Sequence, residues 1–227
     1  MNHPLDRPVW HALTGPQAAL ARRAGQALRI APSYGPFAAA PPGGEADLVR
    51  LLVDPADTIW LVEPEDAPAP PGLVAQRRAE LVQMIADGPL PASARTGPEI
   101  VPLGEADVPE MTALALATKP GPWGPETWRY GQFYGIRAPD GRLAAMAGAR
   151  MRPAPGFAEV SGVATWPEFR GAGHAARLIG HVMTGFLARG DVPFLHSYAD
   201  NQGAIRLYEA LGLRIRQRLV ATILGKT

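Results

Sequence analysis

The sequence contains no cysteine among its 227 residues. Disulfide bonds, thiolate metal sites and a cysteine nucleophile are therefore excluded, and the absence agrees with a reducing compartment. Any catalytic chemistry must come from oxygen and nitrogen atoms. We predict no metal site.

Neither sign of charge is in excess, because 22 Lys and Arg residues stand against 21 Asp and Glu residues. The net charge of +1 gives no basic footprint for nucleic acid and no polybasic patch for a membrane surface. No stretch approaches the roughly 20 apolar residues that cross a bilayer, and residues 1–10 lack the features of a secretory signal. We expect a cytoplasmic protein that binds neither nucleic acid nor membrane.

Glycine and proline are frequent, with 25 of each, and they divide the chain into short segments. In the first part, capping signals and residue periodicity predict helices over 14–30 and 73–86, a helical patch over 45–52, a strand over 58–62 and a loop over 64–72. Residues 88–98 have little apolar content and three prolines, which is typical of a linker. We therefore predict an N-terminal α/β subdomain over 1–95 and a second domain over 99–227.

The second domain alternates more regularly between strand and helix. Patterning predicts strands over 99–103, 133–137, 143–151, 159–165 and 193–199, helices over 109–117, 174–188 and 202–210, and two strand-like segments within 213–224. Asp140-Gly141 is a hairpin turn signal, and residues 119–130 form an irregular aromatic loop. This order predicts an α/β (α+β) fold, with a mixed twisted sheet, antiparallel hairpins and one β-α-β crossover.

The stretch FRGAGHAARLIGHVM, residues 169–183, places two glycines at the start of a predicted helix. Its apolar residues recur at helical spacing, so the helix should pack on a sheet. The first amide groups of a helix have no internal acceptor, and glycine lets a ligand approach the backbone. Arg170 and residues 171–175 could therefore hold a pyrophosphate. The alternative is a tight strand-to-helix turn with Arg170 exposed to solvent.

Two other nucleotide motifs compete with this interpretation. The P-loop pattern Gly-x4-Gly-Lys-Ser/Thr is absent. Gly171, Gly173 and Ala176 satisfy the dinucleotide pattern Gly-x-Gly-x-x-Ala, which would suggest an NAD(P)-dependent oxidoreductase. In that fold the first glycine ends the strand, whereas here five residues follow Thr165 before the loop, and only one crossover remains.

Two blocks of sequence together resemble the GNAT superfamily of N-acetyltransferases. VATWPEFRGAG, residues 163–173, resembles the family's strand, turn and phosphate loop, whose signature Arg/Gln-x-x-Gly-x-Gly/Ala reads here from Arg170 to Ala175. DNQGAIRLYEALGL, residues 200–213, resembles the downstream block in which an Asn opens a helix that carries a Tyr. The resemblance covers roughly residues 99–224, and the N-terminal half could be a degenerate GNAT-like domain.

The resemblance implies a V-shaped opening between strands 159–165 and 193–199, into which the acyl-CoA arm inserts. By resemblance, the backbone of Val163 and Thr165 would pair with the pantetheine, and Asn201 would contact the CoA arm. The pyrophosphate would lie on a loop of six residues, namely Arg170, Gly171, Ala172, Gly173, His174 and Ala175. Asn201 could also be only a helix cap, because that position favours Asn.

Acetyl transfer to an amine needs a base, a polarised thioester carbonyl and a proton for the departing thiolate. Glu159 is a candidate base at the beginning of its strand, although it could equally be a solvated strand end, and His196 is an alternative. Tyr208 is a candidate acid toward the thiolate, since a phenol has a pKa of ~10 and a thiol ~8.5. It could instead be an aromatic residue at the edge of the core.

The sequence thus predicts an N-acetyltransferase that uses acetyl-CoA and acts on a primary amine of a small molecule or peptide. A non-catalytic acyl-CoA-binding or regulatory module is the alternative. The acceptor and the acyl preference stay open, and a homodimer is compatible with the sequence. The aromatic residues of 119–134 could build the acceptor pocket or simply pack.

Overall fold

The computed structural model describes residues 3–91 and 97–227, so residues 92–96 of the predicted linker lie outside the described residues. Its helices are α1 (Pro8–Thr14), α2 (Val108–Thr118), α3 (His174–Leu187) and α4 (Gln202–Ala210). Short 3-10 turns are η1 (Ala18–Leu20), η2 (Glu45–Leu51), η3 (Glu105–Asp107), η4 (Thr127–Tyr130) and η5 (Pro167–Phe169). None of the described helices is long and apolar enough to cross a membrane.

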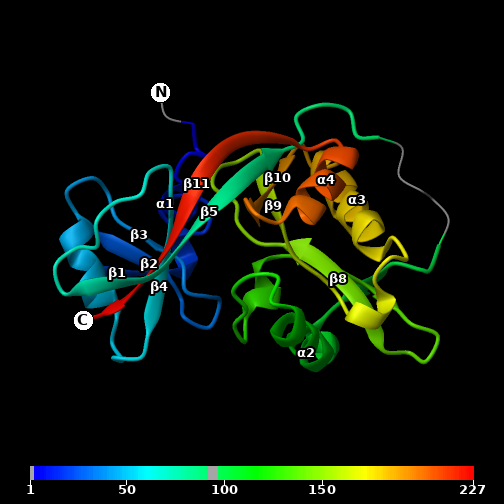
Figure 1. The fold of residues 1–227 in the computed structure, drawn as a ribbon, viewed down its shortest axis with the longest axis horizontal. Coiled ribbons are helices and arrows are strands. Elements are labelled where there is room, and N and C mark those ends of the chain that lie inside the picture. Colours follow the sequence, from blue (N-terminus) through cyan, green and yellow to red (C-terminus); the bar gives the residue numbers. More distant parts are fainter. Residues whose placement is uncertain (1–2, 92–96) are drawn as a thin grey trace.

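The strands form two sheets (Figure 1). The small sheet has the order β1-β2-β3, with strands Ala21–Ala24, Ala27–Ile30 and Ala38–Ala39. The eight-stranded sheet has the order β4-β11-β5-β10-β9-β8-β7-β6. Its strands are, in chain order, Thr58–Glu63, Leu73–Ile85, Val101–Leu103, Phe133–Arg137, Leu143–Ala149, Phe157–Thr165, Val192–Tyr198 and Arg214–Lys226. The predicted mixed α/β fold is confirmed.

The centre of the large sheet is the crossover β9-α3-β10. The two strands pair in parallel only where residues 157–159 meet residues 192–194. Beyond Glu159, β9 continues along β8 while β10 continues along β5. The two strands therefore diverge, and the predicted V-shaped opening lies between them.

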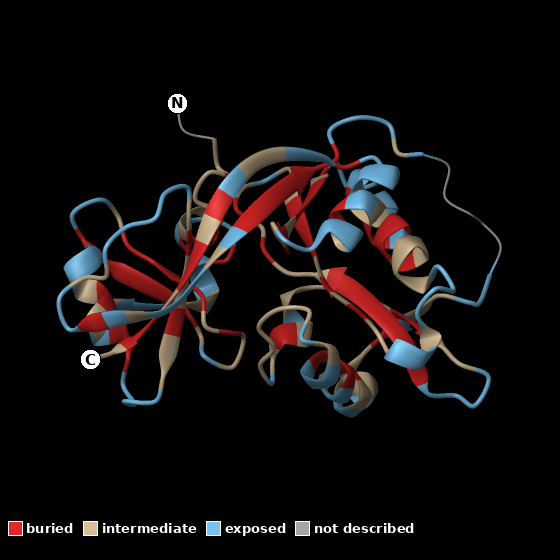
Figure 2. Cartoon of the chain, viewed as in Figure 1, coloured by how far each residue is buried: buried red, intermediate tan, exposed pale blue. Residues whose placement is uncertain are grey.

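Helices cover opposite faces of this part of the sheet. The apolar face of α3 packs with Ala145 and Ala147 of β8, whereas Met111 and Leu114 of α2 pack with Met146. Successive side chains of a strand point to opposite faces, which places the two helices on different sides of β8. Figure 2 shows β8 buried between the partly exposed helices α2 and α3.

The N-terminal half completes the same sheet. Strand β5 lies between β10 and β11, and β4 pairs with the other edge of β11. In Figure 1, β5 and β11 run side by side from the small sheet to β10 and so connect the N-terminal half with the second half. The division at residues 95–99 stays a prediction, but hydrogen bonding crosses it.

Three predicted elements of the sequence were wrong. Residues 14–30 form a short turn and the β1-β2 hairpin instead of a helix, because Gly25 takes a positive φ of 59° that permits a two-residue turn. Residues 73–86 form β5, where pairing with both β10 and β11 overrides the helix propensity of Ala, Gln, Arg and Glu. The final pair of strand-like segments is one long strand, β11, with two register shifts.

Candidate active site

A cavity of about 540 Å³ opens between β9 and β10. Residues 160–165 of β9 line one wall, and residues 195–198 of β10 line the other. At one end it reaches Arg170 and Ala175 at the start of α3. At the other it reaches Arg150 and side chains of the N-terminal half. This size is that of a typical small-molecule site.

The glycine loop has a backbone conformation that glycine adopts readily and other residues do not. Gly171 and Gly173 have φ of 80° and 74°, in the left-handed region that favours glycine. A Cβ placed on either residue would meet no atom within 4 Å, so the backbone there is open to an approaching group. The Nδ1 atom of His174 is buried without a hydrogen-bond partner among the described residues. The 14-residue helix α3 begins without a side-chain cap, and the first amides of a helix have no internal acceptor, so the loop can offer main-chain donors to a ligand.

Strand β9 carries a bulge where it faces the cavity. Gly162 and Val163 together oppose one residue of β8, because the register shifts between Met146 and Gly148. Gly162 has a φ of 61°, and a Cβ on it would lie 2.6 Å from the ring of Phe133, so glycine is required there. Val163 and Thr165, the predicted pantetheine contacts, both line the cavity.

Helix α4 contributes Asn201 and Tyr208 to the wall of the cavity. Asn201 is the N-cap, and its side-chain oxygen accepts a hydrogen bond from the Ala204 amide at 3.2 Å. The Tyr208 side chain makes no hydrogen bond with any described residue. Burial raises the pKa of Tyr208, so its phenol stays protonated at neutral pH.

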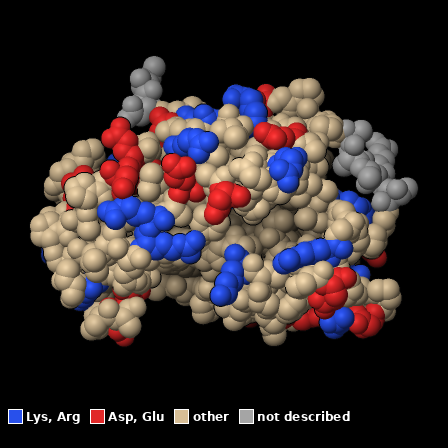
Figure 3. Space-filling model, viewed as in Figure 1, with Lys and Arg blue, Asp and Glu red and all other residues tan. Residues whose placement is uncertain are grey.

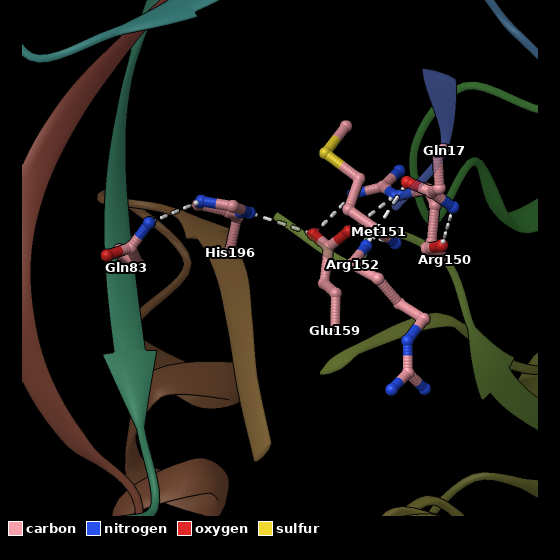
Figure 4. Close-up of polar contacts among 7 residues, drawn as sticks. All are labelled: Gln17, Gln83, Arg150, Met151, Arg152, Glu159 and His196. Atoms are coloured by element: carbon pink, nitrogen blue, oxygen red, sulfur yellow. Dashed lines mark hydrogen bonds and ion pairs between the residues drawn. The ribbon is translucent and has the colours of Figure 1, made fainter. Parts of the chain in front are cut away.

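Glu159 lies beneath the cavity in a closed set of contacts (Figure 4). Its carboxylate is fully buried and accepts hydrogen bonds from Arg150 Nε and Nη2 at 3.0 and 2.8 Å. The Met151 amide and His196 Nδ1 contact it at 3.1 and 2.8 Å. Burial alone would raise the pKa of Glu159, but the Arg150 charge and the His196 hydrogen bond hold it well below its ordinary value. The carboxylate is thus ionised and a weak base.

His196 links this network to the N-terminal half. The side-chain oxygen of Gln83 accepts a hydrogen bond from Arg216 at 2.9 Å, which identifies the other end of the Gln83 amide as the donor. The Gln83 nitrogen donates to the Leu5 carbonyl at 2.8 Å and to His196 Nε2 at 3.0 Å. His196 Nε2 is therefore an acceptor, and Nδ1 carries the hydrogen that is donated to Glu159. Both ring nitrogens are engaged.

Gln17 holds the other side of the network, as Figure 4 shows. Its amide group donates to the Arg150 carbonyl at 2.9 Å and accepts from the Arg152 amide at 3.2 Å. The residue is almost completely buried. A side chain of the N-terminal half thus fixes the backbone on both sides of Met151.

The apolar wall of the cavity comes from residues that the sequence did not single out. Phe37, Trp60, Val62 and Leu81 lie in the N-terminal half and line the cavity together with Ala221 of β11. In the part of the chain that the structure describes, the aromatic residues predicted as an alternative wall pack elsewhere, namely Trp123, Trp128, Tyr130, Phe133 and Tyr134. No local motif marks Phe37 or Trp60, because tertiary structure alone brings them to the site.

Comparisons with known proteins agree with this geometry. The model of the acetyltransferase (GNAT) family matches residues 108–213. A protein of Novosphingobium aromaticivorans, described as an acetyltransferase of the GNAT family, is 65% identical over the full length of both chains, with a TM-score of 0.95. This chain belongs to the GNAT family of acetyltransferases. No curated protein matches it.

More distant GNAT structures share the fold over almost the whole chain. A GCN5-related N-acetyltransferase from Kribbella flavida is 22% identical, with 96% of this chain and 93% of that chain covered at a TM-score of 0.62. A GCN5-related N-acetyltransferase-like protein from Streptococcus suis is 16% identical, with coverages of 96% and 92% and the same TM-score. The N-terminal half is therefore part of a fold that other GNAT structures share.

Proposed function

We propose that this GNAT acetyltransferase transfers an acetyl group from acetyl-CoA to a primary amine by direct attack. The observation that carries the proposal is one continuous cavity that joins the diverging strands and Tyr208 to Arg170 and Ala175, the two residues that flank the loop of residues 171–174. Residues 171–174 themselves do not line it. The open glycine backbone and the uncapped start of α3 fit a pyrophosphate, and the splayed edge of β9 fits an extended pantetheine arm.

The chain's groups can be assigned to the steps of this reaction. The amine nitrogen attacks the thioester carbonyl carbon, a C–N bond forms and the C–S bond breaks. Tyr208 donates its proton to the departing thiolate, while the proton of the amine passes to water and solvent restores the phenol. A backbone amide near Val163 stabilises the carbonyl oxygen as it becomes negative. The products are an N-acetylated amine and the free CoA thiol.

Glu159 has a different place in this proposal from the one that the sequence suggested. Its contacts favour a positioning role over the role of the base. All the hydrogen bonds that it accepts come from Arg150, Met151 and His196. An ionised carboxylate so strongly stabilised takes up a proton poorly at neutral pH.

The test is a panel of amines, read out by release of free thiol from acetyl-CoA, with calorimetry of CoA binding in parallel. We expect Tyr208→Phe to lower kcat about 100-fold, the lower range of general acid catalysis, with CoA affinity unchanged. Tyr134→Phe is the matched control, because Tyr134 packs against His181 and does not line the cavity. An unchanged rate in Tyr208→Phe, with chemistry limiting, would remove Tyr208 from the acid role. CoA binding without turnover of any amine would support the non-catalytic module.

A further inference from the structure

The charged groups that line the cavity are all cationic. They are Lys119, Arg150 and Arg170, and no Asp or Glu residue lines it within the described ranges 3–91 and 97–227. Figure 3 shows this face hollowed across its middle, with Lys and Arg side chains along the hollow. An acceptor that carries only positive charge would find no carboxylate to pair with inside the cavity.

Arg150 has one nitrogen left for a ligand. Its Nε and Nη2 bind Glu159, whereas Nη1 makes no hydrogen bond with any described residue. A Cβ placed on Gly121, which also lines the cavity, would lie 3.5 Å from Nη1. The guanidinium carbon lies 4.9 Å from the centre of the Phe37 ring. Glu159 and Phe37 thus fix the guanidinium in place, and Nη1 faces the cavity wall formed by residues 119–122.

Lys119 stands on the same wall in an unusual backbone conformation. It ends α2 with a φ of 50°, which makes it the one described residue other than glycine with a positive φ. Its side chain makes no ion pair with any described residue. Because Glu159 neutralises Arg150, the acceptor end of the cavity retains about one positive charge, that of Lys119. A single carboxylate would balance it.

We propose that the acceptor is a small molecule in which the amine is accompanied by a carboxylate, with an apolar or aromatic body. The carboxylate binds Arg150 Nη1 and Lys119, and the apolar body packs on the wall of Phe37, Trp60 and Leu81. This inference rests on the proposed acetyl transfer and names the class of amine that it uses. Polyamines and other polycations are disfavoured by the same charges.

The experiment compares acceptors that differ only in the anionic group. Thiol release from acetyl-CoA is measured with phenylalanine, with phenethylamine, with the phosphonate analogue of phenylalanine and with spermidine. We expect kcat/KM for phenylalanine to exceed that for phenethylamine by about 10-fold or more, as one charge-assisted hydrogen bond allows. If kcat/KM is higher for the phosphonate analogue than for phenylalanine, the anion site is retained but its ligand is a phosphonate. That result overturns the carboxylate assignment.

Variants assign the preference to the two cations. Lys119→Met should lower kcat/KM for phenylalanine about 10-fold more than it lowers kcat/KM for phenethylamine. Lys226→Met is the matched control, because Lys226 is the only other lysine and lies outside the cavity lining. Arg150→Lys keeps a charge for Glu159 while removing Nη1, and it should reduce the same preference.

Binding without turnover gives a second readout. N-acetylphenylalanine should raise the melting temperature of the protein more than N-acetylphenethylamine, and Lys119→Met should abolish the difference. Turnover of phenethylamine or spermidine at least equal to that of phenylalanine overturns this inference and leaves acetyl transfer intact. Absence of turnover with every amine overturns both.

Discussion

At the α3 end of the cavity the groups offered to a ligand belong mainly to the main chain, with the side chain of Arg170 beside them, whereas at the Arg150 end they belong to side chains. Gly171 and Gly173 act by having no side chain and a positive φ. Arg150, in contrast, is placed by Glu159, His196 and Gln17. A backbone site can recognise a group that every acyl-CoA shares, because it reads only charge and shape. A site built from side chains can be changed from one protein to another, so we expect acceptor choice to lie there.

The largest expected effect is the loss of CoA affinity in Gly173→Val, which disturbs the α3 end of the cavity. Valine strains the left-handed backbone at φ 74° and covers the open amides. Loss of two charge-assisted hydrogen bonds would weaken CoA binding by about 100-fold or more, measured by calorimetry. Gly190→Val is the matched control, since Gly190 has a φ of 77° and equally open surroundings just beyond the other end of α3. Unaltered CoA affinity in a folded Gly173→Val protein would refute the proposal that the pyrophosphate binds at the glycine loop.

The next effect is on stability, at the side-chain end. Glu159→Gln leaves the Arg150 guanidinium without its counter-charge, and breaking a buried ion pair costs about 3–5 kcal/mol of unfolding free energy. Urea denaturation measures it. Glu80→Gln removes an exposed pair with Arg218, at 3.2 Å, and should cost less than about 1 kcal/mol. Equal losses of unfolding free energy in Glu159→Gln and Glu80→Gln would show that the buried contacts of Glu159 stabilise the protein no more than an exposed ion pair.

The loss of unfolding free energy in Glu159→Gln should depend on pH. Because the folded pKa of Glu159 is depressed, its contribution is complete above the unfolded carboxyl pKa of ~4.3 and is lost as the pH falls toward the folded value. The difference in unfolding free energy between wild type and Glu159→Gln should therefore shrink below about pH 5. A difference that is constant from pH 7 to pH 3 would contradict the ionised state.

The smallest expected effect, that of Gln17→Ala, tests most directly whether the two ends of the cavity act separately. Gln17→Ala removes two hydrogen bonds to the backbone of residues 150 and 152, which should cost about 1–3 kcal/mol. We expect the KM of the acceptor to rise several-fold while CoA affinity stays the same, because only the side-chain end is disturbed. Gln132→Ala, which likewise loses two hydrogen bonds to the backbone, here to the carbonyls of Leu103 and Phe133, is the control outside the cavity. A loss of CoA affinity in Gln17→Ala would show that the Arg150 end and the α3 end of the cavity are coupled, which contradicts the comparison.

Most of the second half of the fold was predictable, whereas in the first half only the helical patch over 45–52, the strand over 58–62 and the loop over 64–72 were. Helices α3 and α4 and the hairpin at Asp140-Gly141 follow from caps, turns and apolar spacing within a few residues. Strand β5 is rich in helix formers, and it is a strand because β10 and β11 supply partners on both sides. The turn at Gly25 was a local signal for the β1-β2 hairpin that the predicted helix over 14–30 overlooked.

By itself, the sequence determined the crossover, the glycine loop and the helix that carries Asn201 and Tyr208. Backbone conformation and capping depend on neighbouring residues, so a short motif can encode them. Only the tertiary structure decided that Gln17, Phe37, Trp60 and Gln83 reach the second half of the chain, and that Glu159 is buried rather than exposed. The hydrogen bonds of Gln17 with Arg150 and of Gln83 with His196 join residues more than 100 positions apart in the chain, and no local periodicity reports them.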